Sequence, residues 1–93
     1  MIDPFVKVPF GRQGLEVPRF GLGCAPLGSI EDASAATALI EHVWQRGIRF
    51  FDTAPLYGRG RSERYLGEVL AQQPRDEFVL STKVGRLVRD GEV

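Results

Sequence analysis

Residues 46–58, RGIRFFDTAPLYG, decide the fold class, because a helix ends, a strand runs and a loop begins within them. Arg46 and Gly47 are typical of a helix C-terminus, where a cation meets the last carbonyls and glycine stops the helix. Residues 48–52 are rich in aromatic and β-branched side chains, which favours a strand that ends at Asp52. The stretch therefore predicts a strand that follows a helix directly and leads into a loop.

Helices are predicted on both sides of this strand. Upstream, residues 29–46 place apolar side chains at helical spacing, and these form one stripe: Ala36, Leu39, Ile40, Val43 and Trp44. This helix starts either at Ser29, which with Asp32 has the spacing of a capping box, or two or three residues later. Downstream, Ser62 is the predicted cap of a second helix, whose apolar stripe is Tyr65, Leu66, Val69 and Leu70.

Further strands complete the pattern. Residues 78–84, FVLSTKV, predict a third βα-type strand, and residues 19–23, RFGLG, predict a buried first one. An N-terminal hairpin is expected from residues 5–8 and 15–17, with Pro9 and Pro18 flanking strands that must be short or at an edge. Strand, helix, strand, helix and strand then follow in order. Such alternation predicts an α/β fold with a parallel sheet and crossover helices.

Two parallel architectures fit this order. A doubly wound nucleotide-binding sheet requires a third glycine after Gly21 and Gly23, but Pro26 stands there and cannot open a helix against a pyrophosphate in the usual way. The loop therefore gives little support to that alternative. A (β/α)8 barrel does not depend on this loop.

The C-terminal ends of the strands carry the candidate chemistry. Asp52 ends one strand and Lys83 lies at the end of the next, so neighbouring parallel strands about 4.8 Å apart would bring them together. Parallel α/β proteins place their sites at this rim. Tyr57 follows Asp52 on the loop that leaves the strand. The spacing predicts a site made of Asp52, Tyr57 and Lys83.

These three side chains together suit proton transfer. A free tyrosine titrates near pH ~10, which is too high for an efficient acid or base at neutral pH. A nearby ammonium favours the phenolate and lowers the pKa of the phenol, and a carboxylate keeps the lysine charged and oriented. Such a phenol can give a proton to a carbonyl oxygen or take one from an alcohol. The matching hydride requires a nicotinamide cofactor, because no side chain supplies one.

The sequence resembles one family over nearly the whole chain. Residues 47–58, with Gly60, Ser62-Glu63 and Leu66-Gly67 after them, are similar to the aldo-keto reductase signature, and GLG at 21–23 and STK at 81–83 fit in order and spacing. The resemblance implies the N-terminal portion of a (β/α)8 TIM barrel preceded by a β-hairpin. It also implies an Asp-Tyr-Lys-His tetrad at the barrel mouth and binding of NADP or NAD without a Rossmann fold.

Site roles follow from the resemblance residue by residue. Tyr57 would be the proton donor or acceptor, Lys83 the group that lowers its pKa, and Asp52 the partner of Lys83. Asp52 would also contact the nicotinamide ribose, as its family equivalent does. Gly23 and Cys24 occupy the loop position that commonly borders the nicotinamide.

One branch of the family is especially similar. Residues 54–60, APLYGRG, and 83–87, KVGRL, resemble D-threo-aldose (L-fucose) dehydrogenases and pyridoxal 4-dehydrogenases, which oxidise a cyclic hemiacetal to a lactone with NAD(P)+. The resemblance thus implies an oxidoreductase that moves a hydride between NAD(P)(H) and a small carbonyl, alcohol or sugar substrate.

A barrel of this kind needs roughly 250 residues. The 93 residues hold the hairpin, two βα units and a third strand, and residues 89–93 fall in the loop expected after that strand. The tetrad histidine belongs after a fourth strand. We therefore expect residues 1–93 to be an incomplete barrel domain, inactive and poorly folded by itself. A non-catalytic regulatory or truncated homologue of the family is the alternative.

Composition narrows the partners. Twelve basic residues balance twelve acidic ones, which gives no indication of nucleic acid or of an anionic membrane. The N-terminus does not resemble a secretory signal and no apolar run approaches the length of a membrane span, so a cytoplasmic protein is expected. The single cysteine excludes an internal disulfide and a four-cysteine metal site, and no metal is expected.

Several residues have a plain structural interpretation. Cys24 is expected to be a packed side chain and not a nucleophile, because no base lies near it in the pattern. His42 lies off the apolar helical stripe and is expected to be solvated. Arg59, Arg61 and Arg64 form a basic cluster for which solvation is expected, with a substrate or phosphate contact as the alternative.

Overall fold

A computed structural model describes residue 3 and residues 5–85, and its centre is a parallel sheet of three strands. The strands are β3 (Leu22–Gly23), β4 (Phe50–Asp52) and β5 (Val79–Ser81), in the order β3-β4-β5. The predicted alternation and the parallel pairing are confirmed. Arg86, Leu87 and the predicted loop at 89–93 lie outside the described residues.

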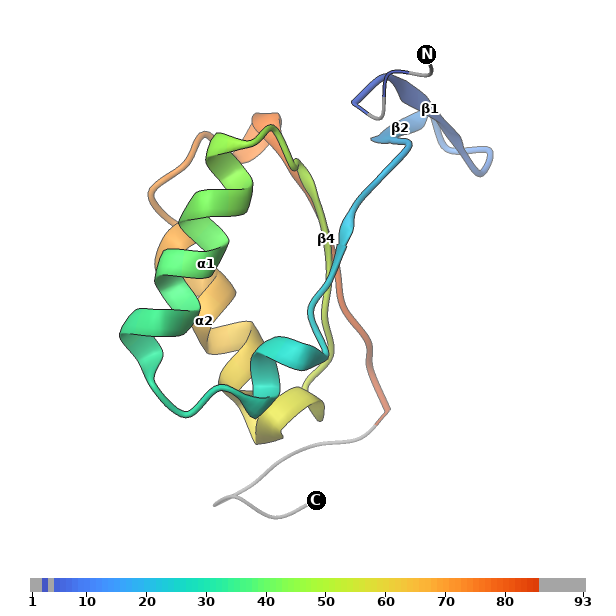
Figure 1. Cartoon of the computed structure of the whole chain (residues 1–93). Coiled ribbons are helices and arrows are strands. Elements are labelled where there is room, and N and C mark those ends of the chain that lie inside the picture. The colour runs from blue at the N-terminus through green and yellow to red at the C-terminus, as the bar shows by residue number, and fades with distance from the viewer. Residues whose placement is uncertain (1–2, 4, 86–93) are drawn as a thin grey trace.

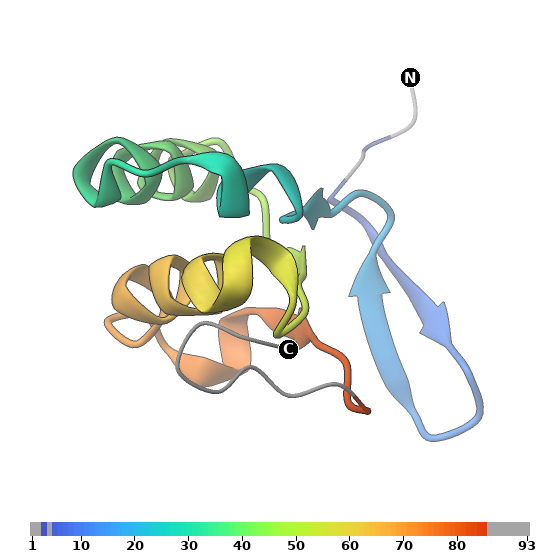
Figure 2. The ribbon, with the colours of Figure 1, turned by 90° about the horizontal axis from the view of Figure 1, so that it is seen from below.

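Two helices, α1 (Ala33–Gln45) and α2 (Arg61–Leu70), lie side by side on one face of the sheet (Figures 1 and 2). Phe51 of the central strand points into the layer between sheet and helices and is fully buried there. Burying a side chain of this size is worth about 1.5–3 kcal/mol. Its partners in the core are Cys24, Leu27, Ala36, Ile40, Tyr65, Leu66, Val69, Leu70 and Phe78.

The start of α1 follows the later of the two predicted alternatives. Asp32 is the N-cap, and its Oδ1 accepts hydrogen bonds from the N–H groups of Ser34 and Ala35 at 3.0 and 3.4 Å. A hydrogen bond from the Ser34 hydroxyl is the largest cause that lowers the pKa of Asp32, and these two backbone bonds lower it further. Ser29 instead ends a short 3₁₀ helix, η1 (Pro26–Ser29). The helix therefore begins where a carboxylate satisfies its free N–H groups.

The predicted cap of α2 is wrong. Gly60, whose φ is +100°, takes the N-cap position, and Ser62 lies inside the first turn with its side chain fully buried. The 3₁₀ turn η2 (Tyr57–Gly60) precedes the helix and brings the chain round into it. The left-handed conformation at Gly60 costs little without a Cβ, so glycine serves at a position where a polar cap was expected.

The hairpin consists of β1 (Lys7–Phe10) and β2 (Leu15–Pro18), which pair in antiparallel fashion as a separate two-stranded sheet. Pro9 lies inside β1, opposite Glu16, and does not flank the strand as predicted. Each strand of such a pair has a free edge, so the missing N–H of proline need not interrupt the pairing. In Figure 1 the hairpin lies beyond the end of the sheet at which β3 begins.

The first βα strand is shorter and more exposed than predicted. Only Leu22 and Gly23 pair with β4, Gly23 is exposed and Phe20 is 60% exposed. β3 lies at one edge of the described sheet, where it has a neighbour on one side only. The apolar run therefore indicated a strand correctly. Its burial was not confirmed, because in the described part of the chain only one side of β3 is covered by a neighbouring strand, β4.

Candidate active site

Asp52 and Lys83 meet at the C-terminal edge of the sheet. β4 and β5 pair in parallel with Asp52 opposite Ser81, and Lys83 follows two residues later. The Nζ atom of Lys83 lies 3.4 Å from both carboxylate oxygens of Asp52 and donates to the backbone carbonyl of Thr53 at 3.1 Å. The predicted contact between Asp52 and Lys83 is confirmed.

Tyr57 completes the group from the loop that leaves β4. It is half-buried at the start of η2, and Nζ of Lys83 lies 5.1 Å from the centroid of its ring. The next residue, Gly58, has φ of +63°, a conformation that glycine adopts without a steric penalty and that turns the chain back towards α2. The three residues predicted from spacing thus lie together at one edge of the sheet.

The lysine of this group is held as a cation. A hydrogen bond with Tyr57 is the largest cause that raises the pKa of Lys83, and the hydrogen bond and charge of Asp52 raise it further. The side chains of Lys83 and Asp52 remain 51% and 46% exposed. An ion pair so open to solvent adds little to folding stability, so its effect is on charge and orientation.

A buried pair of hydroxyls supports the loop behind these residues. Thr53 Oγ1 lies 2.7 Å from Ser62 Oγ, which donates to the backbone carbonyl of Cys24 at 2.9 Å. Thr53 also donates its backbone N–H to Ser81 at 2.8 Å, so it links β5 to the same group. The sequence reasoning missed this role of Ser62. Its position one turn before the stripe residues Tyr65 and Leu66 was a signal that it faces the core.

Two pockets adjoin the ion pair. One, of about 220 Å³, is lined by Ala54, Pro55, Leu56, Tyr57, Lys83 and Val84. The other, of about 200 Å³, is lined by Gly21, Leu22, Gly23, Phe50 and Asp52. Tyr57 and Lys83 line the first pocket, and Asp52 lines the second. The ion pair therefore has one open space on each side.

Residues 19–93 match the model of the aldo/keto reductase family, a region that holds every strand of the parallel sheet and the whole of this site. This chain belongs to the aldo/keto reductase family. The family match decides between the two parallel architectures in favour of the barrel.

Named relatives of this aldo/keto reductase chain agree. It is 51% identical over 79 residues to a D-threo-aldose 1-dehydrogenase of Pseudomonas sp., with 82% of the chain and 24% of the relative covered. It is 49% identical over 85 residues to a pyridoxal 4-dehydrogenase of Microbacterium luteolum, with 88% of the chain and 25% of the relative covered. The chain thus spans about a quarter of the length of these curated relatives.

A solved structure supports the barrel fold. The holo form of an aldo-keto reductase from Bacillus halodurans superposes with a TM-score of 0.79 at 34% identity, covering 91% of this chain and 28% of that one. The described hairpin, strands and helices therefore correspond to the N-terminal portion of an aldo/keto reductase TIM barrel.

The predicted cofactor residues differ in accessibility. Gly23 is exposed, with no atom within 4 Å of the place where a Cβ would stand, and Asp52 presents a half-exposed carboxylate beside it. An open glycine lets a flat ring approach the backbone, and a carboxylate accepts hydrogen bonds from ribose hydroxyls. Cys24 is fully buried, and its thiol donates to the carbonyl of Leu22. The accessible Gly23 and Asp52 fit a nicotinamide nucleoside, and the cofactor contacts of Gly23, Cys24 and Asp52 all stay predictions.

Burial governs the chemistry of Cys24. Loss of solvent is the largest cause that raises the pKa of its thiol, which reaches about 11. A thiol so placed remains protonated at neutral pH and is a poor nucleophile. The interpretation of Cys24 as a packed side chain is confirmed.

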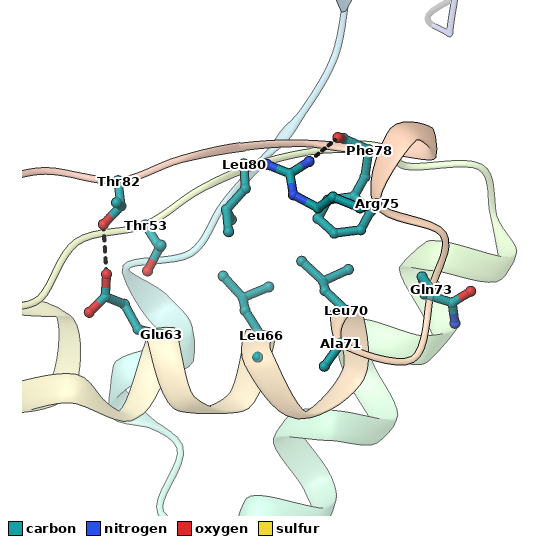
Figure 3. Close-up of a pocket in the computed structure, with 11 residues that line it drawn as sticks. Thr53, Glu63, Leu66, Leu70, Ala71, Gln73, Arg75, Phe78, Leu80 and Thr82 are labelled. Atoms are coloured by element: carbon teal, nitrogen blue, oxygen red, sulfur yellow. Dashed lines mark hydrogen bonds between the residues drawn. The ribbon is translucent and has the colours of Figure 1, made fainter.

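A further apolar pocket of about 420 Å³ lies between α2 and β5 (Figure 3), and neither Tyr57 nor Lys83 lines it. Leu66 and Leu70 of the helix point towards Leu80 and Phe78 of the strand region across it. The hydroxyl of Thr82 donates to Glu63 at 2.7 Å at one end. The pocket carries none of the predicted site residues.

His42 and Arg61, two further residues considered in the sequence, differ in their surroundings. His42 is exposed on α1, as expected. Arg61 is not solvated as expected, because its Nη1 donates to the carbonyl of Gly28 at 3.1 Å. Within the described residues, no three side chains of the types His, Cys, Asp or Glu gather closely enough to hold a metal. None of the described helices has the length and apolar character needed to cross a membrane.

Proposed function

We propose that this chain supplies the phenol, ammonium and carboxylate of an NAD(P)(H)-dependent oxidoreductase. The observation that carries the proposal is the position of Lys83, whose Nζ contacts the Asp52 carboxylate and lies over the Tyr57 ring. Membership of the aldo/keto reductase family and the names of the two dehydrogenase relatives support it.

In this proposal Tyr57 moves a proton at its phenolic oxygen. Lys83 remains charged and favours the phenolate left when Tyr57 gives a proton to a carbonyl oxygen, and Asp52 keeps the ammonium directed at the phenol. In the reverse direction the phenolate takes the proton of an alcohol or hemiacetal. Gly23 and Asp52 would hold a nicotinamide, which would provide the hydride acceptor or donor that no side chain supplies. Proton and hydride together account for the two hydrogens exchanged.

The substrate class that we propose is a small aldehyde, alcohol or sugar hemiacetal. The relatives are named for D-threo-aldose and for pyridoxal. The pocket of about 220 Å³ beside Tyr57 has mostly apolar walls from Ala54, Pro55 and Leu56. Such walls suit the less polar face of a compact ring, whose oxygen then meets the phenol.

We also propose that residues 1–93 form the hairpin, two βα units and third strand of a longer barrel domain. In the described sheet, β3 and β5 each pair with β4 alone, and Leu80 is 39% exposed beside the apolar pocket of Figure 3. Further βα units of the same chain would cover such surfaces. The isolated 93 residues are accordingly proposed to be inactive.

The test is Tyr57→Phe in the full-length protein. We expect NAD(P)-linked turnover to fall by ~100-fold or more, because the phenyl ring has no proton to transfer. Binding of NADPH or NADH, followed by nicotinamide fluorescence, should change little. Tyr65→Phe is the matched control, since that phenol is buried and donates to the carbonyl of Ile30 at 2.7 Å, away from Lys83. Undiminished turnover in Tyr57→Phe would contradict the proposed role, and absence of turnover in the wild-type protein would favour a non-catalytic homologue.

A further inference from the structure

The loop after β3 makes a close backbone contact with the loop of Tyr57. Gly28 of η1 is buried, and a Cβ built on it would lie 2.6 Å from the carbonyl carbon of Tyr57 and 2.7 Å from Cα of Gly58. It would come closer still to the backbone nitrogen of Gly58. Because these are backbone atoms, no rotamer change relieves the contact, and the Tyr57–Gly58 peptide would have to move.

The contact is equally tight from the other side. A Cβ on Gly58 would lie 2.7 Å from the carbonyl carbon of Gly28 and would collide with the Gly28 carbonyl oxygen. Figure 1 shows η1 and η2 side by side at the same end of the sheet. Two glycines, 30 positions apart in the sequence, therefore set the distance between these two loops.

Side chains of α2 fasten the same loop independently. Arg61 Nη1 donates to the Gly28 carbonyl at 3.1 Å, and Ser62 Oγ donates to the Cys24 carbonyl at 2.9 Å. Both donors belong to the first turn of the helix that follows Tyr57. Two hydrogen bonds thus hold the loop from Cys24 to Gly28 against α2, one at each end, and they oppose its retreat when the contact with Gly58 is crowded.

We propose that Gly28 is a positioning residue for Tyr57. Its backbone forms the surface against which the Tyr57–Gly58 peptide rests, and this sets where the phenol stands relative to Lys83. The inference rests on the proposed proton transfer by Tyr57. A displacement of about 1 Å in a reacting group costs on the order of 100-fold in rate, and a Cβ at Gly28 forces a shift of that peptide.

The experiment is Gly28→Ala in the full-length protein, compared with Gly67→Ala. The Gly67 position is helical and exposed, with nothing within 4 Å of a Cβ, so its alanine tests the substitution without the contact. We expect Gly28→Ala to lower kcat by about 10- to 100-fold while the Kd for NADPH or NADH changes by less than about twofold. Gly67→Ala should leave both unchanged. Unchanged kcat in folded Gly28→Ala overturns the inference.

Combining Gly28→Ala with Tyr57→Phe distinguishes a positioning effect on the phenol from a general loss of structure. If Gly28 acts through the phenol, Gly28→Ala lowers single-turnover rates in the native background and has little further effect once the phenol is gone. Equal losses in both backgrounds overturn the inference. If Tyr57→Phe alone retains full turnover, the proposed function fails instead, which is a distinct result.

Arg61→Met provides a second route if Gly28→Ala does not fold. It removes the hydrogen bond to Gly28 without adding volume at the contact, and Arg64→Met, from an exposed position on the same helix, is its control. A severalfold loss of kcat with unchanged cofactor Kd in Arg61→Met alone supports the inference. Equal kcat in the two arginine variants overturns it.

Discussion

The ammonium of Lys83 lies 3.4 Å from both oxygens of the Asp52 carboxylate, although 31 positions separate the two residues in the sequence. The parallel pairing of β4 with β5 creates this contact, because it sets Asp52 opposite Ser81 and carries Lys83 just past the strand end. The charge arrangement of the site is therefore a direct product of sheet register, and shifts in that register would separate the pair.

Replacing the carboxylate should weaken catalysis and change its pH dependence. In Asp52→Asn of the full-length protein we expect kcat to fall by ~100-fold or more, because the lysine loses its orienting partner. Asp52 is among the causes that raise the pKa of Lys83, so the alkaline limb of the kcat profile should move to lower pH. A kcat profile between pH 6 and pH 11 measures both effects. Asp76→Asn, at an exposed position, is the control, and an unmoved limb would contradict the ion-pair role.

Removing the buried serine hydroxyl should destabilise the protein. Ser62→Ala leaves the Thr53 hydroxyl and the Cys24 carbonyl without their shared partner, at a cost of about 1–3 kcal/mol in the free energy of unfolding. Urea denaturation of the full-length protein measures the change. Ser29→Ala, at an exposed position, should stay within about 0.5 kcal/mol of wild type. Equal stability of the two variants would refute the support role of Ser62.

The thiol of Cys24 should be unreactive in the folded protein, and its burial should lower folding stability at high pH. Burial raises its pKa from 9.0 to about 11, so the folded state keeps a proton that the unfolded state releases above pH 9. The contribution of this group to stability is therefore complete below pH 9 and is lost as pH rises towards 11. Peptide mapping after iodoacetamide at pH 8 should find Cys24 alkylated only in denaturant. Rapid alkylation of the native protein would show that the thiol is accessible.

The isolated 93-residue chain should neither melt cooperatively nor catalyse turnover. Its described core packs two helices on one face of three short strands, and large apolar side chains such as Phe10 and Phe20 are 59% and 60% exposed. Thermal scans by circular dichroism, with the full-length protein as control, test this expectation. A sharp transition accompanied by aldehyde reduction would show that the chain folds and acts alone.

Local sequence signals predicted the parts of the site that depend on strand direction. The end of β4 at Asp52 follows from residue type and alternation. The third strand was predicted over residues 78–84 with Lys83 at its end, whereas β5 ends at Ser81 and Lys83 lies two residues past it. Parallel pairing still brings Asp52 and Lys83 together. Tyr57 follows from its place on the loop that leaves β4, five residues after Asp52. These predictions needed only the order of elements, which apolar periodicity specifies well.

Features that depend on close packing were not predictable in this way. Serine is a common helix cap, but Ser62 lies in the core. The helix starts one residue earlier, at Arg61, because Gly60 takes the N-cap position. The contact between Gly28 and Gly58 leaves no pattern in either segment alone, since it exists only when the two loops meet. The sequence likewise indicated a solvated side chain for Arg61, because its hydrogen bond to the Gly28 carbonyl forms only in the folded chain.

The buried hydroxyl pair has a fixed polarity. A serine hydroxyl carries one proton, and that of Ser62 is committed to the Cys24 carbonyl, so Thr53 must be the donor in the bond between the two hydroxyls. The chain of hydrogen bonds therefore ends at an acceptor that has no proton to pass on. The pair therefore holds the loop after β3 against the start of α2 and passes no proton beyond the Cys24 carbonyl.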